Sequence, residues 1–386
     1  MSSLLSKVAQ LRTRIVDRSY GWTGIEIGRH AIQLAQIEKV RGNFRLSAIW
    51  TVEHACKSSP DVSESDDIPP GNFAWETPET FSKHGIDALT LEQLDNLNAL
   101  FRGRKCSATL NDGLIEYREL ELPEASPSES QSMVHSEIAI ETACEFDEIV
   151  TACWNLPKGN ARSSSVSMGA VSLRKSTAMR LANQLLSVGF ECQTLDALPC
   201  AMARSLSIMN REPSSVSMAI DLGYEQSTLI VMAGEQLVLT RCLRNQGLLQ
   251  LLHQIAATYD VSLSDANVLL IQSESKLSSD SLGSNNSLSA LHQQINRMLQ
   301  SLRHEIERTL RYLDRSLGIT RPAQLVLMGH GSAIPNISRL MEGKLGIATI
   351  PWTMEYRNGE DDSTHLAPFA VAAGLSLLAW EDAQCM

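Results

Sequence analysis

Two stretches of the chain, GIEIGRHAIQLAQIE (24–38) and AIDLGYEQSTLIVMAGE (219–235), follow the same pattern. Each is a short apolar strand that ends in acid–x–Gly and continues into a second, alternating strand, as in a β-hairpin. A glycine at such a turn has no Cβ, so the backbone can approach a ligand closely. The exposed amides of the turn form a concavity that binds anions. The repeat therefore predicts a duplicated fold in which two hairpins face each other across a cleft and grip a polyphosphate.

A third stretch, LVLMGHGSAIPNISRL (325–340), combines a strand, a glycine turn at Gly329 and Gly331, and the start of a helix. A third element of this kind, with the helix N-terminus just beyond the turn, is needed to hold the nucleoside of a ligand whose polyphosphate the two hairpins grip. The hairpin carboxylates Glu26 and Asp221 can hold Mg²⁺ through its water shell. A single acid–x–Gly hairpin is more often only a hairpin, but the three elements in this order indicate a nucleotide cleft.

Composition limits the class of protein. The chain has 386 residues, 43% of them hydrophobic, which is enough for roughly two to four domains. Its net charge of -11 argues against a large nucleic-acid footprint, which needs clustered Lys and Arg. The eight cysteines form no CxxC pair and are expected to be reduced thiols. No signal peptide is visible and the longest apolar run, 367–380, is too short to span a bilayer, so a soluble cytosolic chain is expected.

Hydrophobic periodicity divides the chain into two halves of similar design, each opening with three antiparallel strands. These strands are expected at 24–28, 32–38, 44–52, 216–222, 227–232 and 236–242. A smaller unit between the halves is expected to have strands at 106–110, 114–122, 149–155 and 165–172 and helices at 127–142 and 174–188. Further helices are expected at 91–101, 246–259, 263–271, 288–318, 333–344 and 368–379, a strand at 324–328, and polar loops at 57–83 and 273–287.

The first twenty residues place Leu4, Val8, Leu11 and Ile15 at helical spacing, with Lys7, Arg12, Arg14 and Arg18 among them. This pattern predicts an amphipathic N-terminal helix. The helix either packs on the protein or serves as a weak membrane-surface or partner-docking segment.

The three elements resemble the two phosphate motifs and the adenosine motif of the actin-like ATPase superfamily, and within it the PilM family of type IV pilus assembly proteins. LRHEIERTLRYLDRSLG (302–318) and APFAVAAGLSL (367–377) are similar to the helix before the adenosine motif and to the closing helix. YRELELPE (117–124) and FDEIVTACW (146–154) resemble the small inserted subdomain that PilM shares with FtsA. The resemblance implies an α/β protein with the actin-like ATPase fold, in which two duplicated lobes surround a nucleotide cleft.

The resemblance also implies a division of the chain. The expected units are an N-terminal amphipathic segment (1–20), a first actin-like lobe (21–105), an inserted small subdomain (106–188), a return to the first lobe (189–214) and a second lobe (215–386). The second lobe contains a helical subdomain (246–320) and the adenosine motif with the closing helix (321–386).

ATP and Mg²⁺ are the implied ligands, with Glu26 and Asp221 at the metal. The residues implied at the nucleotide are Glu26, Gly28, Arg29, Asp221, Gly223, Gln226, Ser227, Thr228, Asn267, Gly329, His330, Gly331 and Ser332.

Several positions depart from the family pattern. Arg29 replaces a small Ser or Thr, and its guanidinium either pairs with phosphate or fills the pocket. Asn267 and Leu270 stand where relatives carry a Glu and a Lys that hold the nucleoside, and His330 replaces a glycine. Loss of charged contacts should weaken binding. Weak or absent ATP binding and near-background hydrolysis are therefore expected, with no catalytic residue nominated.

The function implied is that of a cytoplasmic scaffold, peripheral to the inner membrane, in a type IV pilus or type II secretion platform. Its expected partner is the cytoplasmic tail of a PilN-like membrane protein, bound as an extended or short helical peptide between the first lobe and the inserted subdomain. Homo-oligomerisation is compatible with this role, and nucleic acid is not an expected partner. The alternatives are a sugar or acetate kinase-like phosphotransferase and an FtsA-like division adaptor.

Overall fold

The computed structural model describes residues 18–53 except Arg29, 97–110 except Asn98, 115–157, 165–209, 215–272, 286–357 and 366–381. The N-terminal segment before Arg18, the predicted loop 57–83, and most of the predicted helix 91–101 and loop 273–287 lie outside these residues. Within the described ranges, no helix has both the length and the apolar character needed to cross a membrane.

The first sheet runs in the order β1 (Arg18–Tyr20), β3 (Ala31–Val40), β2 (Thr23–Ile27), β5 (Lys105–Leu110) and β9 (Glu191–Leu195), with β4 (Asn43–Glu53) paired to β3. One face packs against α5 (Lys175–Ser187), whose Leu181 and Leu185 are buried with Ile25 and Leu34. The predicted boundaries 106 and 188 are therefore too wide for the inserted unit. Both β5 and α5 belong to the first lobe, since β5 pairs in parallel with β2 and β9.

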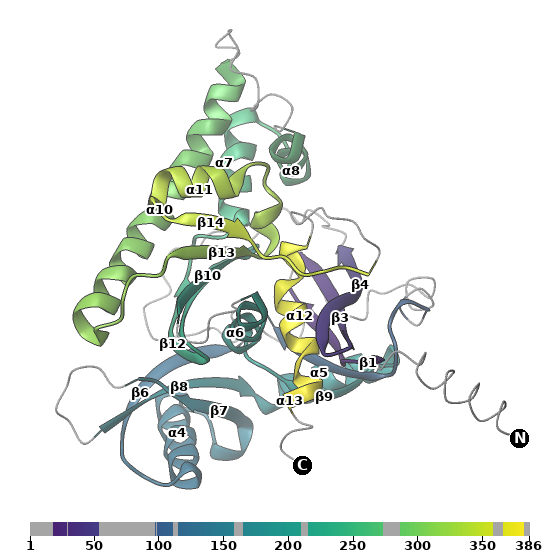
Figure 1. Ribbon diagram of the computed structural model, residues 1–386, viewed down its shortest axis with the longest axis vertical. Helices are drawn as coiled ribbons and strands as arrows, with labels where there is room; N and C mark the ends of the chain where they lie inside the picture. Colours follow the sequence, from purple (N-terminus) through teal and green to yellow (C-terminus); the bar gives the residue numbers. More distant parts are fainter. Residues whose placement is uncertain are drawn as a thin grey trace, which may run out of the picture.

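The second sheet repeats this design in the order β12 (Gln236–Leu243), β11 (Ser227–Ala233), β10 (Val216–Leu222), β13 (Gln324–Met328) and β14 (Ala348–Pro351). In both sheets the first strand of the hairpin, β2 or β10, has an antiparallel partner on one side and a parallel partner on the other. The helices packed on this lobe are α7 (Leu248–Tyr259), α8 (Leu263–Gln272), α10 (Asn286–Tyr312) and α11 (Ile337–Leu345) (Figure 1). The α-helical part of the predicted helix 288–318 ends at Tyr312, because five π-helical residues and Gly318 in the left-handed region close it.

The third sheet has the order β6 (Glu116–Pro123), β8 (Ser165–Arg174) and β7 (Ile149–Asn155), with α4 (Pro127–Thr142) against one face. A capping box between Ser126 and Glu129 starts α4 at the predicted residue. The sheet lies at the lower left in Figure 1, below the second sheet. Trp154 of β7 packs on the core between the lobes, and the Gln236 side chain donates to the carbonyl of Asn155 (3.4 Å). The third sheet thus contacts the second lobe as well as the first.

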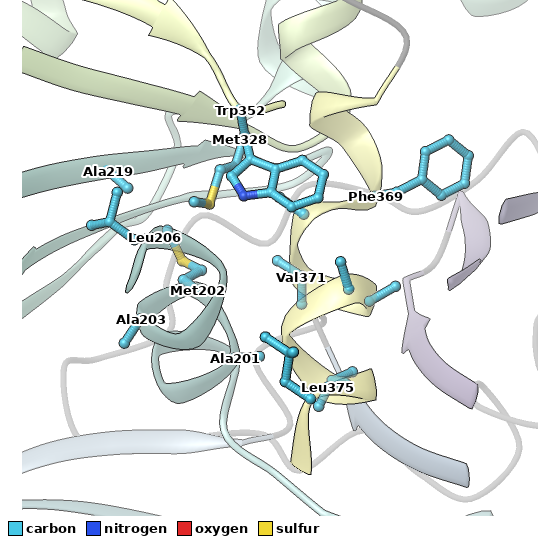
Figure 2. Close-up of a cluster of buried hydrophobic side chains, with 14 of the residues drawn as sticks. Ala201, Met202, Ala203, Leu206, Ala219, Met328, Trp352, Phe369, Val371 and Leu375 are labelled. Atoms are coloured by element: carbon cyan, nitrogen blue, oxygen red, sulfur yellow. The ribbon is translucent and has the colours of Figure 1, made fainter. Parts of the chain in front are cut away.

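Two helices, α6 (Leu198–Met209) and α12 (Ala370–Ser376), form the centre of the molecule between the two large sheets (Figure 2). Ser376 accepts a hydrogen bond from the Ile37 amide (2.9 Å) and donates to the Trp22 carbonyl (2.6 Å), which ties α12 to the first sheet. Trp352, fully buried after β14, donates through its indole nitrogen to the carbonyl of Ser205 in α6 (3.0 Å). One hydrophobic cluster, separate from the cores within each lobe, therefore joins the lobes.

Candidate functional site

The three turns predicted from the sequence meet where the first and second sheets face each other. His30, after the first glycine turn, stacks on Tyr224 of the second turn, with ring centroids 4.3 Å apart and planes 7° from parallel. His330 of the third turn meets His30 edge-on, at 6.0 Å between centroids. Each ring comes from a different stretch of the chain, so the three motifs do converge in space.

The first turn is closed by a hydrogen bond from the Gly28 amide to the Ala31 carbonyl (3.0 Å). Glu26, just before it on β2, is 2% exposed. The amide of Gln33, oriented so that its nitrogen meets acceptors, donates to Glu26 Oε2 (3.2 Å) and to the Pro368 carbonyl (2.6 Å). This carboxylate is thus linked to the short helix η6 (Ala367–Phe369) that leads into α12. Arg29 lies outside the described residues.

Asp221, the acid of the second hairpin, is fully buried at the end of β10. Its strand neighbours are Thr228 on β11 and Met328 on β13. A Cβ at Gly329 would lie only 1.9 Å from Asp221 Oδ1, and Gly329 has a φ of +80°. Glycine is therefore required at 329 by its conformation and by the carboxylate that lies against it.

The second turn is attached to the N-terminus of α7. The amides of Leu248 and Leu249 donate to the carbonyls of Gly223 (3.0 Å) and Tyr224 (2.7 Å). The Ser227 hydroxyl donates to the Gln246 carbonyl, and the side-chain carbonyl of Gln226 accepts from the Cys242 thiol (3.0 Å). Two predicted phosphate ligands, Gln226 and Ser227, thus already hydrogen-bond within the protein.

The third turn differs from the prediction of a helix beginning near 333. Residues His330–Ala333 form a single 3₁₀ turn (η4), and α11 begins only at Ile337. Ser332 directs both its amide (3.0 Å) and its hydroxyl (2.6 Å) at the carbonyl of Gly329. Gly331 packs on Leu222, since a Cβ there would lie 2.7 Å from the Leu222 Cβ. This turn is tightened against the second hairpin.

Of the two positions that the resemblance places at the nucleoside, 270 carries a buried leucine. Leu270 is 1% exposed and packs in the core of the second lobe with Leu251 and Ile255. A lysine at this position of α8 would face that core, because the helix turns position 270 inward. Asn267, three residues earlier on α8, is partly buried and stays a candidate.

His30 and Tyr224 were not among the predicted site residues, although they join the two hairpins. A ring close after each turn glycine is the sequence signal that could have identified them: His30 is two residues after Gly28, and Tyr224 is one residue after Gly223. Burial, followed by electrostatic interaction with the neighbouring His30, lowers the pKa of His330 from 6.5 to about 4. The His330 ring is therefore neutral at physiological pH.

The glycines and the two buried carboxylates are suited to a phosphate and a hydrated Mg²⁺, which proteins usually bind through one or two carboxylates. No group of three or more His, Cys, Asp or Glu side chains that could hold a metal directly occurs among the described residues. The stacked rings of His30 and Tyr224 lie between the first and second turns, where a polyphosphate held by both hairpins would also have to lie.

No protein-family model matches the sequence, and no curated protein matches it. Among solved structures, the chain is similar to one described as the PilM–PilN type IV pilus biogenesis complex. The TM-score is 0.69 at 20% identity, over 93% of this chain and 98% of that one. A more distant likeness is to the ethanolamine utilization protein EutJ from Carboxydothermus hydrogenoformans (TM-score 0.49, 11% identity, 93% and 90% covered). Another is to the cytoplasmic domain of EpsL, from the type II secretion system of Vibrio cholerae (0.34, 11%, 69% and 79%).

The likeness to the chain from the PilM–PilN complex extends over nearly the whole length of both chains. This chain has two sheets of repeated design and a third, smaller sheet whose strands are inserted between β5 and β9 of the first. This chain therefore has the actin-like ATPase fold, in the form known from the PilM–PilN complex.

Proposed function

We propose that the chain is a PilM-like scaffold at the cytoplasmic face of the inner membrane, in a type IV pilus or type II secretion platform. Its partner is the cytoplasmic tail of a PilN-like membrane protein. The observation that carries this proposal is the match along 93% of the chain to a protein solved as a PilM–PilN complex.

The surface proposed for the tail lies between α5 of the first lobe and the third sheet. Three apolar side chains are exposed there: Phe146 (55%) in the 3₁₀ turn η2 (Phe146–Glu148), Val150 (40%) in β7 and Met179 (58%) in α5. Val150 pairs with Leu173 of β8, and paired residues share a face of the sheet. Leu173 packs in the core of the first lobe, so Val150 lies on the face of β7 that is turned to that lobe.

The geometry of β7 favours an extended tail. Among the described residues no strand pairs with its outer edge, since β7 is the last strand of the third sheet. A peptide can add to such an edge through main-chain hydrogen bonds, while its side chains fill neighbouring apolar pockets. His135 holds the adjacent η2 turn in place through contacts with Thr151 Oγ1 (2.9 Å) and the Phe146 carbonyl (2.8 Å).

Nucleotide binding, within this proposal, is weak and serves to set the angle between the lobes. Asp221 and Glu26 would hold Mg²⁺ through water, and the turn glycines Gly28, Gly223 and Gly329 would accept the phosphates closely. The internal hydrogen bonds of Gln226 and Ser227 and the stack of His30 on Tyr224 support low affinity, because a nucleotide must displace them.

Binding of a fluorescent peptide, made from the cytoplasmic tail of the membrane protein encoded next to this chain, tests the proposal by anisotropy. Val150→Asp should weaken binding by about tenfold or more, since burial of a Val side chain contributes about 1.5 kcal/mol or more. The matched control is Ile271→Asp, at an apolar position of α8 that is 51% exposed, and it should leave affinity unchanged. No binding at about tens of micromolar, or equal losses in both variants, would refute the proposal.

A further inference from the structure

A large groove opens between the lobes at the end of α12 opposite the candidate site. Its volume is about 1170 Å³. The first lobe contributes Phe44 at the start of β4, and the second contributes Met232 and Met354. The last turn of α6 and Trp380 of α13 (Leu378–Glu381) complete the lining. Phe44 and Trp380 meet edge-on with their centroids 5.0 Å apart, which gives the groove an aromatic wall.

The charged side chains of this groove are mainly acidic. Glu235, Glu355 and Glu381 line it and are exposed, with Glu355 3.8 Å from Arg45 beside the groove. The one basic side chain in the described lining, Arg204, is already paired with Asp196 (2.5 Å) and Glu381 (2.9 Å). An apolar floor with an acidic rim fits an amphipathic segment that carries positive charge.

The N-terminal segment of this chain has that character and enters the structure beside the groove. Residues 1–17 contain Lys7, Arg12 and Arg14 against one acid, Asp17, with Leu4, Val8, Leu11 and Ile15 at helical spacing. In β3, Val40 pairs with Arg18 on one edge and with Asn43 on the other. Arg18 is therefore two strand spacings, about 10 Å, from Asn43 of the groove lining.

We propose that residues 1–17 fold back as an amphipathic helix into the groove of their own chain. A helix is about 10–12 Å wide with its side chains and rises 1.5 Å per residue, so the groove volume corresponds to roughly two turns. Two turns bring the apolar stripe around Val8 and Leu11 onto the groove floor, and Lys7, Arg12 and Arg14 to its acidic rim. Because both lobes line the groove, the bound segment joins them on the side opposite the candidate site.

Photo-crosslinking in the full chain tests this assignment. With benzoylphenylalanine in place of Leu11, crosslinks within one chain should map to peptides that contain groove residues, namely 203–209, 232–235, 353–355 and 377–381. Glu235→Lys should reduce the yield by about threefold, the effect of turning one exposed ion pair into a repulsion. Glu342→Lys, at an exposed acid of α11 outside the groove lining, is the matched control and should not change it.

Amide exchange over residues 4–15 is the second readout: it should be slowed in the wild type and faster in Glu235→Lys. Crosslinked species of dimer mass would assign the groove to the segment of a second copy and overturn the proposal. Crosslinks that map only elsewhere would also overturn it, as would protection that appears only when vesicles of anionic lipid are added.

Discussion

Two glycines in helices provide a direct test of how closely the central helices approach. Gly374 lies within α12, where a Cβ would be 1.9 Å from the Ala201 carbonyl oxygen and 2.8 Å from Ser205 Oγ of α6. Gly343 lies within α11, and nothing is within 4 Å of its Cβ position. The substitutions Gly374→Ala and Gly343→Ala therefore make the same chemical change in two different environments.

The expected magnitudes have opposite signs. Ordinary contact begins at 3.4 Å, so a methyl at 374 requires α6 and α12 to move apart by about 1.5 Å, the difference between 3.4 and 1.9 Å. Overpacking of this kind costs about 3 kcal/mol, against a gain of about 1 kcal/mol in helix propensity. Gly374→Ala should thus destabilise the protein by about 2 kcal/mol, and Gly343→Ala should stabilise it by about 1 kcal/mol.

Urea unfolding followed by tryptophan fluorescence measures both, because Trp352 and Trp380 pack on the core that contains Gly374. With a urea dependence of about 3 kcal/mol per molar, the midpoint should fall by about 0.7 M for Gly374→Ala and rise by about 0.3 M for Gly343→Ala. Stabilisation by both substitutions would show that the backbones of α6 and α12 are not in close contact.

Two further predictions concern the rings at the candidate site. His30→Ala removes the stack on Tyr224, worth about 1 kcal/mol, so Mg-ATP affinity measured by calorimetry should rise by about fivefold. Asp221→Asn should abolish the heat of Mg-ATP binding in the wild type and in His30→Ala. An unchanged Mg-ATP affinity in His30→Ala would contradict the view that the rings occupy the phosphate position. His330 titrates near 4 when folded and near 6.5 when unfolded, so the unfolded chain binds the proton first as pH falls. The associated stability, on the order of 3 kcal/mol, is present above pH 6.5 and lost towards pH 4. The urea midpoint of His330→Gln should vary less between pH 6.5 and pH 4 than that of the wild type. An equal dependence of the midpoint on pH in the two proteins would show that protonation of His330 is not the cause.

Local signals were sufficient to predict most elements of this protein from its sequence. Alternating side chains and the acid–x–Gly turns predicted the hairpin strands to within a few residues of β2, β3, β10 and β11. The predicted helix 127–142 has the bounds of α4, where Ser126 and Glu129 form a capping box. These signals depend on residues a few positions apart, so the sequence records them directly.

Only the tertiary structure decided which elements share a sheet and which side chains meet at the site. Position 270 has a helical pattern that is equally compatible with a ligand-facing and a core-facing side chain, and packing against Leu251 buries it. β14 contains four residues and is defined by its pairing with β13, which no local pattern records. His30 and Tyr224 stack although they are far apart in the chain. The spacing of hydrophobic residues shows which side of a helix or strand is apolar. The surface against which that side packs depends on how the two lobes close around α6 and α12.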